Sequence, residues 1–239
     1  MPHFDIVKQS DIDKTYRVAR IMGDYDVKLD HANEHFIGTI DLPEDWQIGV
    51  IWGGSGTGKT TIARELFGDQ LITGFEYTAK SVVDDMPKEC GMDEIEKMFY
   101  SVGFGSVPCW LKPYSVLSNG EKMRVDLARA MLERDFVVFD EFTSVVDRQV
   151  AQTASLAISK AVRRTGKKFI AVTCHKDIID WLEPDWVFDT NEMTGFFAKA
   201  DVLKNLRGSG MSAGRMAKVS AISLFEYRTC NSCKMLRRL

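Results

Sequence analysis

The chain has 239 residues, of which 45% are hydrophobic and 27% are charged, enough for one large α/β domain or two small ones. No apolar run approaches the length of a membrane span and the first residues do not form a signal peptide, so we expect a cytoplasmic protein without membrane insertion. The five cysteines are odd in number and scattered, which favours reduced thiols over a disulfide framework.

The net charge of −3 hides an asymmetry along the chain. Residues 199–239 hold nine Lys/Arg and two acids, whereas residues 1–198 hold 22 basic and 32 acidic residues. An acidic body with a basic tail is consistent with an anionic partner such as a nucleic acid, and equally with a solvated tail that contacts nothing specific.

The first third of the chain is predicted to contain short strands and one helix. Residues 4–7, 15–21 and 36–40 suit strands, which would form a small antiparallel layer before the core. Residues 47–52 indicate a short buried strand. Residues 60–67 indicate a helix that ends near Gly68.

A glycine-rich stretch joins that strand to that helix and matches the phosphate-binding pattern G-x-x-x-x-G-K-[ST]. Its glycines allow successive N–H groups to point at phosphate oxygens, and the helix adds the positive end of its dipole. Lys59 is suited to neutralise the β- and γ-phosphates, and the Thr60 hydroxyl to hold Mg²⁺. The predicted nucleotide-contacting residues here are Gly53, Gly54, Ser55, Gly56, Thr57, Gly58, Lys59, Thr60 and Thr61.

The middle of the chain is predicted to contain one strand and two helices. Residues 80–83 suit a core strand, and residues 92–100 have helical periodicity. After an irregular Gly/Pro stretch, residues 118–133 read as a helix. Ser118 as N-cap and Glu121 three residues on form a capping box.

Strands and helices alternate in the remainder of the predicted core. Residues 136–139, 169–173 and 185–188 read as strands, the last of them closing the core, and residues 150–164 read as a helix. This alternation predicts a mainly parallel sheet with both faces covered. Residues 207–218 read as a flexible linker, and residues 219–239 as a basic tail or the stump of a second domain.

Two acids, Asp140 and Glu141, follow the apolar run 136–139. A buried strand that ends in carboxylates delivers them beside a phosphate site. Asp140 would hold Mg²⁺ through water, and Glu141 would polarise the attacking water as general base. The alternative is a strand end with two solvated acids.

The segment 117–122, Leu-Ser-Asn-Gly-Glu-Lys, resembles the Leu-Ser-Gly-Gly-Gln signature of the ATP-binding cassette (ABC) ATPases. Ser118 and Gly120 match the serine and glycine that approach the γ-phosphate, whereas Asn119 and Glu121 depart from the pattern. Residues 144–147 resemble the loop that crosses between two subunits, and His175 resembles the switch histidine. Tyr25 is a candidate for stacking on adenine, a role for which Tyr16, Phe36 and Trp46 compete.

The resemblance implies a P-loop fold of ABC type: a mainly parallel core sheet with an N-terminal antiparallel β layer and a reduced helical subdomain, about residues 86–133, within an ATPase domain spanning 1–206. It implies ATP and Mg²⁺ as cofactors, with Lys59, Glu141 and His175 in catalysis. It also implies a head-to-tail homodimer, in which the phosphate loop of one copy and the Ser118 segment of the other enclose each ATP.

One departure concerns the glutamine that this family usually carries at a strand end between the phosphate loop and the signature. No Gln occurs between Gln70 and Gln149. Asp84 or Asp85, after the predicted strand 80–83, would occupy its place; Asp85 is the candidate third Mg²⁺ residue beside Thr60 and Asp140, with a turn cap as the alternative.

These observations favour a soluble, non-transporter ABC ATPase that acts on nucleic acid or on a protein partner. Two alternatives stay open. One is the nucleotide-binding subunit of an ABC membrane transporter, and the other is an ATP-gated binding module with little turnover.

Overall fold

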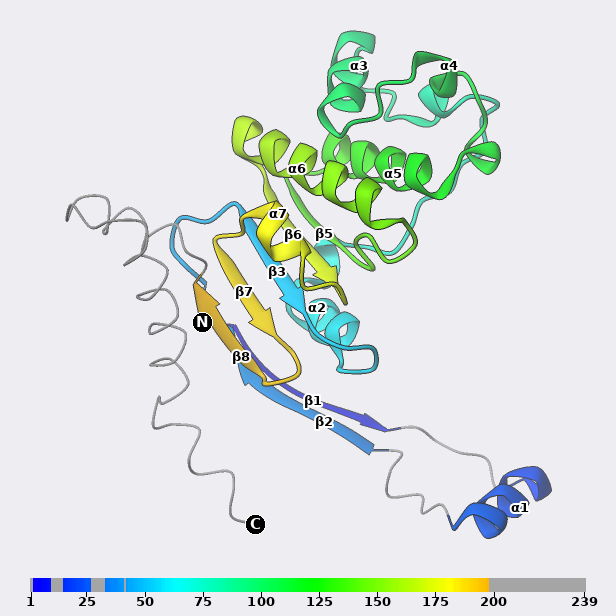
Figure 1. Ribbon diagram of the computed structural model, residues 1–239, viewed down its shortest axis with the longest axis vertical. Coiled ribbons are helices and arrows are strands. Elements are labelled where there is room, and N and C mark those ends of the chain that lie inside the picture. The colour runs from blue at the N-terminus through cyan, green and yellow to red at the C-terminus, as the bar shows by residue number, and fades with distance from the viewer. Residues whose placement is uncertain (1, 10–14, 27–32, 41, 198–239) are drawn as a thin grey trace, which may run out of the picture.

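The computed structural model describes residues 2–9, 15–26, 33–40 and 42–197 (Figure 1). The predicted linker 207–218, the tail 219–239 and their basic residues lie outside this part of the chain. The strands are β1 His3–Gln9, β2 Asn33–Thr39, β3 Ile48–Trp52, β4 Leu71–Ile72, β5 Phe136–Phe139, β6 Lys168–Thr173, β7 Trp186–Asp189 and β8 Thr194–Phe197. The helices are α1 Tyr16–Tyr25, α2 Lys59–Phe67, α3 Met92–Ser101, α4 Val107–Trp110, α5 Asn119–Glu133, α6 Arg148–Thr165 and α7 Ile178–Leu182, with 3-10 turns η2 Gly68–Gln70, η3 Val82–Asp85 and η4 Tyr114–Val116.

A six-stranded sheet in the order β4-β5-β6-β3-β7-β8 forms the centre of the described chain. The strands from β4 to β7 pair in parallel, and β8 pairs antiparallel with β7. β3 lies between β6 and β7, with Val50 opposite both Ala171 and Val187. The predicted parallel core is therefore confirmed, but β7 is not its last strand, because β8 extends the sheet.

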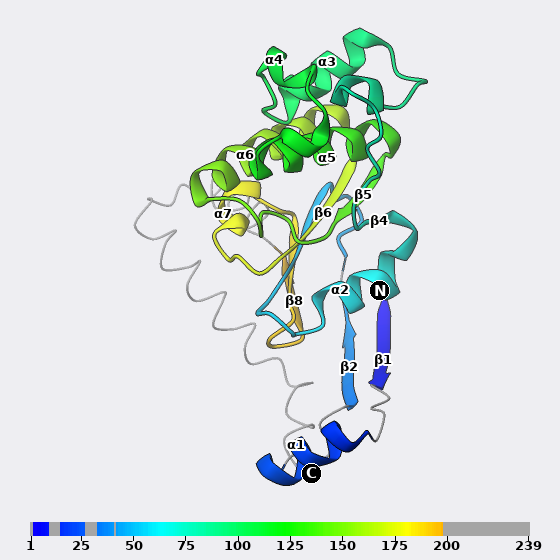
Figure 2. The ribbon, with the colours of Figure 1, turned by 90° about the vertical axis from the view of Figure 1, so that its right-hand side faces the viewer.

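Apolar residues alternate along the strands and build a separate core on each face of the sheet. Val50 and Ala171 face one core, to which α3, α5, α6 and α7 contribute. The adjacent Ile51 and Val172 face the other core, which α2, β1 and β2 complete. Figures 1 and 2 show the same arrangement, with α5 and α6 on one side of the sheet and α2 on the other. Burial on both faces explains why these strands are nearly continuous apolar runs in the sequence.

The antiparallel layer consists of β1 and β2, which pair in register from His3–Thr39 to Gln9–Asn33. Both strands were predicted, but the third expected strand, residues 15–21, is wrong. This segment forms α1, whose first turn is capped by the Thr15 hydroxyl, which accepts a hydrogen bond from Val18 N–H at 3.3 Å. The alternation of apolar residues that suggested a strand also fits the i, i+3 spacing of a one-sided helix.

The helices α3, α4 and α5 with the turn η4 lie in the range predicted for the helical subdomain, beyond the sheet (Figure 1). The predicted core strand at residues 80–83 is wrong. Val82 begins the turn η3 and is fully buried among residues of this helical layer. The Ser81 hydroxyl donates to the carboxylate of Asp84, and this local bond competes with extended pairing.

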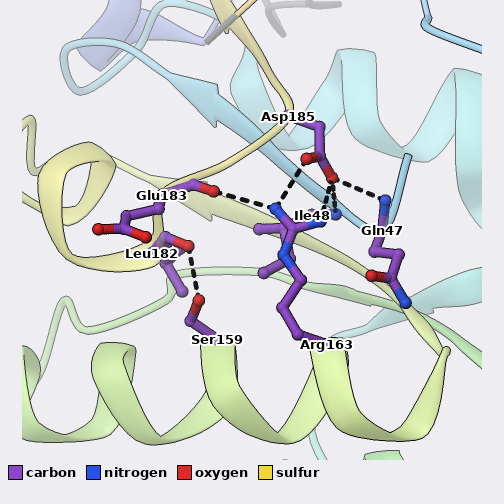
Figure 3. Close-up of polar contacts among 7 residues, drawn as sticks. All are labelled: Gln47, Ile48, Ser159, Arg163, Leu182, Glu183 and Asp185. Carbon is purple, nitrogen blue, oxygen red and sulfur yellow. Dashed lines mark hydrogen bonds and ion pairs between the residues drawn. The ribbon is translucent and has the colours of Figure 1, made fainter. Parts of the chain in front are cut away.

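Asp185 ties the start of β3 to α6 and to the start of β7, as Figure 3 shows. Its carboxylate accepts hydrogen bonds from Gln47 N–H at 2.8 Å, from Ile48 N–H at 2.9 Å and from the Arg163 guanidinium at 2.7 and 2.8 Å. Burial acts to raise the pKa of this carboxyl, but the bonds from Arg163 and the two amides outweigh it and hold the pKa below its usual range. The entry of β3, the strand that carries the phosphate loop, is thereby fixed.

Within the described ranges, no helix combines the length and the apolar composition needed to cross a membrane.

Candidate nucleotide-binding site

The phosphate loop connects β3 to α2, as predicted, and two of its glycines have left-handed backbone conformations. Gly56 has φ 79° and Gly58 has φ 82°, a region that residues with a side chain rarely adopt. A Cβ atom on Gly58 would lie 2.6 Å from the ring of Phe36, and one on Gly53 would lie 2.0 Å from Thr190 Oγ1. The loop is therefore packed from two sides, by β2 and by the turn after β7.

Lys59 is the first residue of α2 and is only 8% exposed. Its Nζ donates a hydrogen bond of 2.5 Å to the carbonyl oxygen of Gly54, across the loop. The Thr57 hydroxyl donates to the same carbonyl at 2.9 Å. A buried ammonium held inside a curl of backbone at a helix N-terminus is a fit for an anionic ligand, because both the charge and the helix dipole favour it.

Thr60 and Asp140 meet although 80 residues separate them. The Thr60 hydroxyl donates to Asp140 Oδ1 at 3.2 Å, and Glu141 N–H donates to the same oxygen at 2.9 Å. Asp140 N–H in turn donates to the carbonyl of Ile72 in β4 at 3.3 Å. A hydroxyl beside a carboxylate is the hard oxygen donor set that Mg²⁺ prefers, so these residues fit the predicted ion.

Glu141 follows Asp140 with a left-handed backbone, φ 51°, which is rare for a residue with a side chain. Its side chain is exposed, and its Oε2 accepts a hydrogen bond of 2.5 Å from the Ser144 hydroxyl. The unusual φ turns the chain sharply at the end of β5. Strain of this kind is common at catalytic positions, where it aims a side chain.

His175 comes two residues after the end of β6, and its N–H donates to the hydroxyl of Thr173 at 3.1 Å. Its ring Nδ1 is buried and has no hydrogen-bond partner within the described residues. Because β5, β6 and β3 are parallel neighbours, their carboxyl ends lie at one edge of the sheet. Asp140, His175 and the phosphate loop therefore follow three adjacent strand ends.

The predicted capping box at the start of α5 is confirmed. Glu121 Oε2 accepts hydrogen bonds from the Ser118 N–H at 2.8 Å and from the Ser118 hydroxyl at 2.7 Å, and Glu121 N–H donates to that hydroxyl at 3.4 Å. The Cys109 thiol donates to the other oxygen, Oε1, at 3.1 Å. The hydrogen bonds from Cys109 and Ser118 hold the pKa of Glu121 below its usual value. The departure from glutamine at this position thus serves the helix cap.

Gly120 lies against the N-terminal turn of α6, where an added Cβ would be 2.9 Å from Val150 Cγ1. The Asp147 side chain caps α6 by accepting from Gln149 and Val150 N–H, both at 2.9 Å. The predicted signature and the predicted crossing loop are therefore neighbours. α5 and α2 cover opposite faces of the sheet, and among the described residues no hydrogen bond joins Ser118 to the phosphate loop.

Two of the predicted site residues lie in surroundings that differ from those expected. Tyr25 is the last residue of α1 instead of part of the β layer, and it is 72% exposed. Both views place α1 at the end of the β1–β2 pair that is distant from α2 (Figures 1 and 2). The competing aromatic residues divide into buried Phe36 and Trp46 and exposed Tyr16. The role of Tyr25 in adenine stacking stays a prediction.

Asp85 does not follow a strand, because it lies in η3. Its carboxylate accepts hydrogen bonds from Thr78 N–H at 3.0 Å and from Ala79 N–H at 3.1 Å, the turn-cap arrangement that was the alternative to metal binding. The strand that ends beside Asp140 is β4, so Thr73 and Gly74 occupy the strand end at which the glutamine was expected.

Sequence reasoning did not identify Thr190 and Asn191, which contact the phosphate loop from the turn after β7. It also missed a cluster in which Tyr77 and Tyr114 both donate to Asp126, at 2.7 and 2.8 Å. Neither set belongs to a sequence motif. Only the order of strands in the sheet brings such residues together.

The fold is similar to solved ABC cassettes. The dimeric structure of a bacterial ABC transporter cassette matches with a TM-score of 0.52 and 14% identity over 65% of this chain and 87% of that chain. A post-hydrolysis dimer of that cassette with ADP and Pi matches with a TM-score of 0.53 and 12% identity, over 78% of this chain and 92% of that chain. The structure of a putative metal-chelate type ABC transporter in an inward-facing conformation matches with a TM-score of 0.55 and 14% identity, over 71% of this chain and 78% of that chain.

No protein-family model and no curated protein matches the sequence. At these identities the likeness is one of fold, and the fold is that of an ABC ATPase cassette, as the motifs predicted.

Proposed function

We propose that the chain binds ATP with Mg²⁺ and hydrolyses it to ADP and phosphate. The observation that carries this proposal is the contact between Thr60 and Asp140, at 3.2 Å, beside a phosphate loop with a buried lysine. It joins the two motifs of a P-loop ATPase, which lie 80 residues apart in the sequence, into one donor set.

Each residue at this edge has a distinct task in the proposed reaction. Lys59 exchanges its bond to Gly54 for the phosphate oxygens. Thr60 and Asp140 would hold Mg²⁺, and the ion would supply positive charge beside the phosphates. Glu141 orients the attacking water and accepts its proton. The Nδ1 of His175, which has no partner in the part of the chain that the structure describes, is suited to a hydrogen bond with the substrate.

We propose further that the site is completed by a second copy of the chain. Ser118 is the exposed N-cap of α5 on the helical side of the sheet, and it makes no bond to the phosphate loop of its own chain within the described residues. One of the similar cassettes has been solved as a dimer in two structures. A head-to-tail pair would bring Ser118 of one copy to the phosphates bound by the other, giving two equivalent sites.

Glu141→Gln tests the reaction and the dimer together. We expect ATP turnover to fall about 100-fold, the usual order for removal of a catalytic group, while ATP-dependent dimers accumulate because ATP is no longer consumed. Glu96→Gln, which removes an exposed carboxylate of α3, is the matched control and should behave as the parent chain. An unchanged rate in Glu141→Gln would refute the role of Glu141.

For the process served, we propose a role outside a membrane transporter, on nucleic acid or a protein partner. The strand end after β4 carries Thr73 and Gly74 in place of glutamine, and the basic residues of 199–239 offer charge to an anionic partner. Stimulation of ATP turnover by DNA or RNA, with none by membranes, would support this role. Co-purification with a membrane subunit would favour the transporter alternative, and binding of ATP without turnover would favour an ATP-gated module.

A further inference from the structure

The turn between β7 and β8 holds the phosphate loop from outside. We propose that Thr190 and Asn191 in this turn are positioning residues that keep the loop in its nucleotide-binding shape. This inference rests on the proposed ATP-binding function, and it assigns to the turn a task that no motif indicates.

Thr190 directly follows β7, lies beside the loop and is a buried polar residue, only 2% exposed. Its N–H donates to the carbonyl of Trp52 at 2.8 Å, which fixes the turn to the last residue of β3. Its Oγ1 lies 2.6 Å from Thr57 Oγ1 and 3.2 Å from the Trp52 carbonyl. Because the Thr57 hydroxyl donates to the Gly54 carbonyl at 2.9 Å, Thr190 is the donor in its contact with Thr57, and this bond ties the turn to the loop.

The fit between Thr190 and the loop is close enough to require glycine. A Cβ on Gly53 would lie 2.0 Å from Thr190 Oγ1 and 2.8 Å from Thr57 Oγ1, distances that no side chain tolerates. Gly53 therefore admits the Thr190 hydroxyl into the loop. This is a second reason, besides phosphate approach, for a glycine at this position.

Asn191 holds the backbone N–H of Gly54. Its Oδ1 accepts a hydrogen bond from Gly54 N–H at 3.0 Å, while the Gly54 carbonyl accepts from Lys59 and Thr57. The Asn191 amide is itself oriented, because its Nδ2 and its backbone N–H both donate to Asp189 Oδ1 at 2.8 Å. The backbone of Gly54 is thus held at both its N–H and its carbonyl group.

The energetic need for such a support follows from the composition of the loop. Gly53, Gly54, Gly56 and Gly58 make it among the most flexible stretches that a chain can contain, and ordering it upon binding opposes affinity. Contacts from the turn between β7 and β8, which is joined to two sheet strands, order the loop before the nucleotide arrives, and this lowers that cost. Because they act on the empty loop, their loss should weaken ATP binding more than the chemical step.

Thr190→Val and Thr190→Ser form the matched pair for the test, because valine keeps the shape and loses the hydroxyl, whereas serine keeps the hydroxyl. Calorimetric titration measures the Kd for ATP. We expect this Kd to rise about tenfold in Thr190→Val, as for one lost hydrogen bond, and to stay within about twofold of the parental value in Thr190→Ser. The KM for ATP should rise in parallel while kcat at saturating ATP stays within about threefold, a split that general damage to the fold would not produce.

Asn191→Ala tests the second contact at an exposed position, where folding is not at risk, and Glu192→Ala in the same turn is its control. We expect weaker ATP binding in the first variant and none of this effect in the second. Parental ATP affinity in Asn191→Ala and in Thr190→Val would overturn the inference, and if Thr190→Val does not fold, Asn191→Ala alone decides. If the parent chain itself binds no ATP, the proposed function fails, which is a distinct result.

Discussion

The phosphate-loop half and the signature half of the proposed site are held by contacts of very different range. In the first, Thr60 meets Asp140 across 80 residues and Gly54 meets Asn191 across 137. In the second, Ser118 and Glu121 are three residues apart. One half is assembled by the strand order of the sheet and the other by the first turn of a helix.

This difference suggests how the two halves behave. The phosphate-loop half is as stable as the sheet, because unfolding it separates strands that are buried on both faces. The local geometry of the signature half is set by the first turn of α5, and α5 itself packs into the same core as one face of the sheet.

The largest expected effect comes from a substitution in the phosphate-loop half, at Asp140. Asp140→Asn removes the charge that would hold Mg²⁺ and should lower ATP turnover by about 100-fold or more, the order found when a group that stabilises transition-state charge is lost. Turnover measured across a Mg²⁺ titration checks this, with Asp93→Asn on α3 as the control. Full activity in Asp140→Asn would show that the residue does not serve the metal.

The second largest effect is a loss of stability expected in the cluster that connects the two halves. This cluster consists of Tyr77 after β4, Tyr114 before the signature and Asp126 on α5. The two tyrosine rings stack at 3.9 Å, and both hydroxyls donate to the Asp126 carboxylate, whose pKa is raised by burial. Asp126→Ala leaves both hydroxyls without this partner and should cost about 3 kcal/mol of unfolding free energy. Urea denaturation measures it, and Asp126→Asn, which keeps an acceptor, should cost less.

A smaller effect is expected at Asp185, which anchors β3. Asp185→Asn should lower the unfolding free energy at pH 7 by about 1.5 kcal/mol, the low end for a charge-assisted hydrogen bond because the site is partly exposed. The folded-state pKa is depressed, so this stabilisation is present above the ordinary aspartate value and is lost as the pH falls through the folded-state value. The parent and the variant should therefore converge in acid, and a difference that persists there would contradict the assignment.

The smallest effect is expected in the signature half. Glu121→Ala removes the acceptor of the capping box and should destabilise the chain by about 0.5 kcal/mol, whereas Glu121→Gln keeps an acceptor and should change it less. Thermal unfolding in the absence of nucleotide measures both. A large loss in Glu121→Gln would mean that the charge at this position does more than cap α5.

What the sequence predicts follows the same division. The capping box, the phosphate loop and the acids after β5 are local patterns, and each was found where the spacing placed it. The segments 15–21 and 80–83 were predicted wrongly as strands because β-branched and aromatic residues suit strands as well as one-sided helices or buried turns. The latter segment carried with it the expectation that Asp85 follows a strand.

The supports of the site lie beyond local patterns. Thr190, Asn191 and Asp126 have ordinary neighbours in the sequence, and their roles arise only when β7 lies beside β3 and when the loop after β4 meets α5. Predicting them requires the strand order and the register, which a single sequence does not specify at the level of residues.

The central claim, a site shared between two copies, is tested most directly by mixing two inactive variants. Lys59→Ala damages the phosphate loop and Ser118→Arg the signature, and each should fold but hydrolyse no ATP alone. In an equal mixture, half of the dimers pair an intact loop with an intact signature at one site, so activity should return to about a quarter of the parental rate. An equal mixture that forms mixed dimers but stays inactive would contradict the shared site.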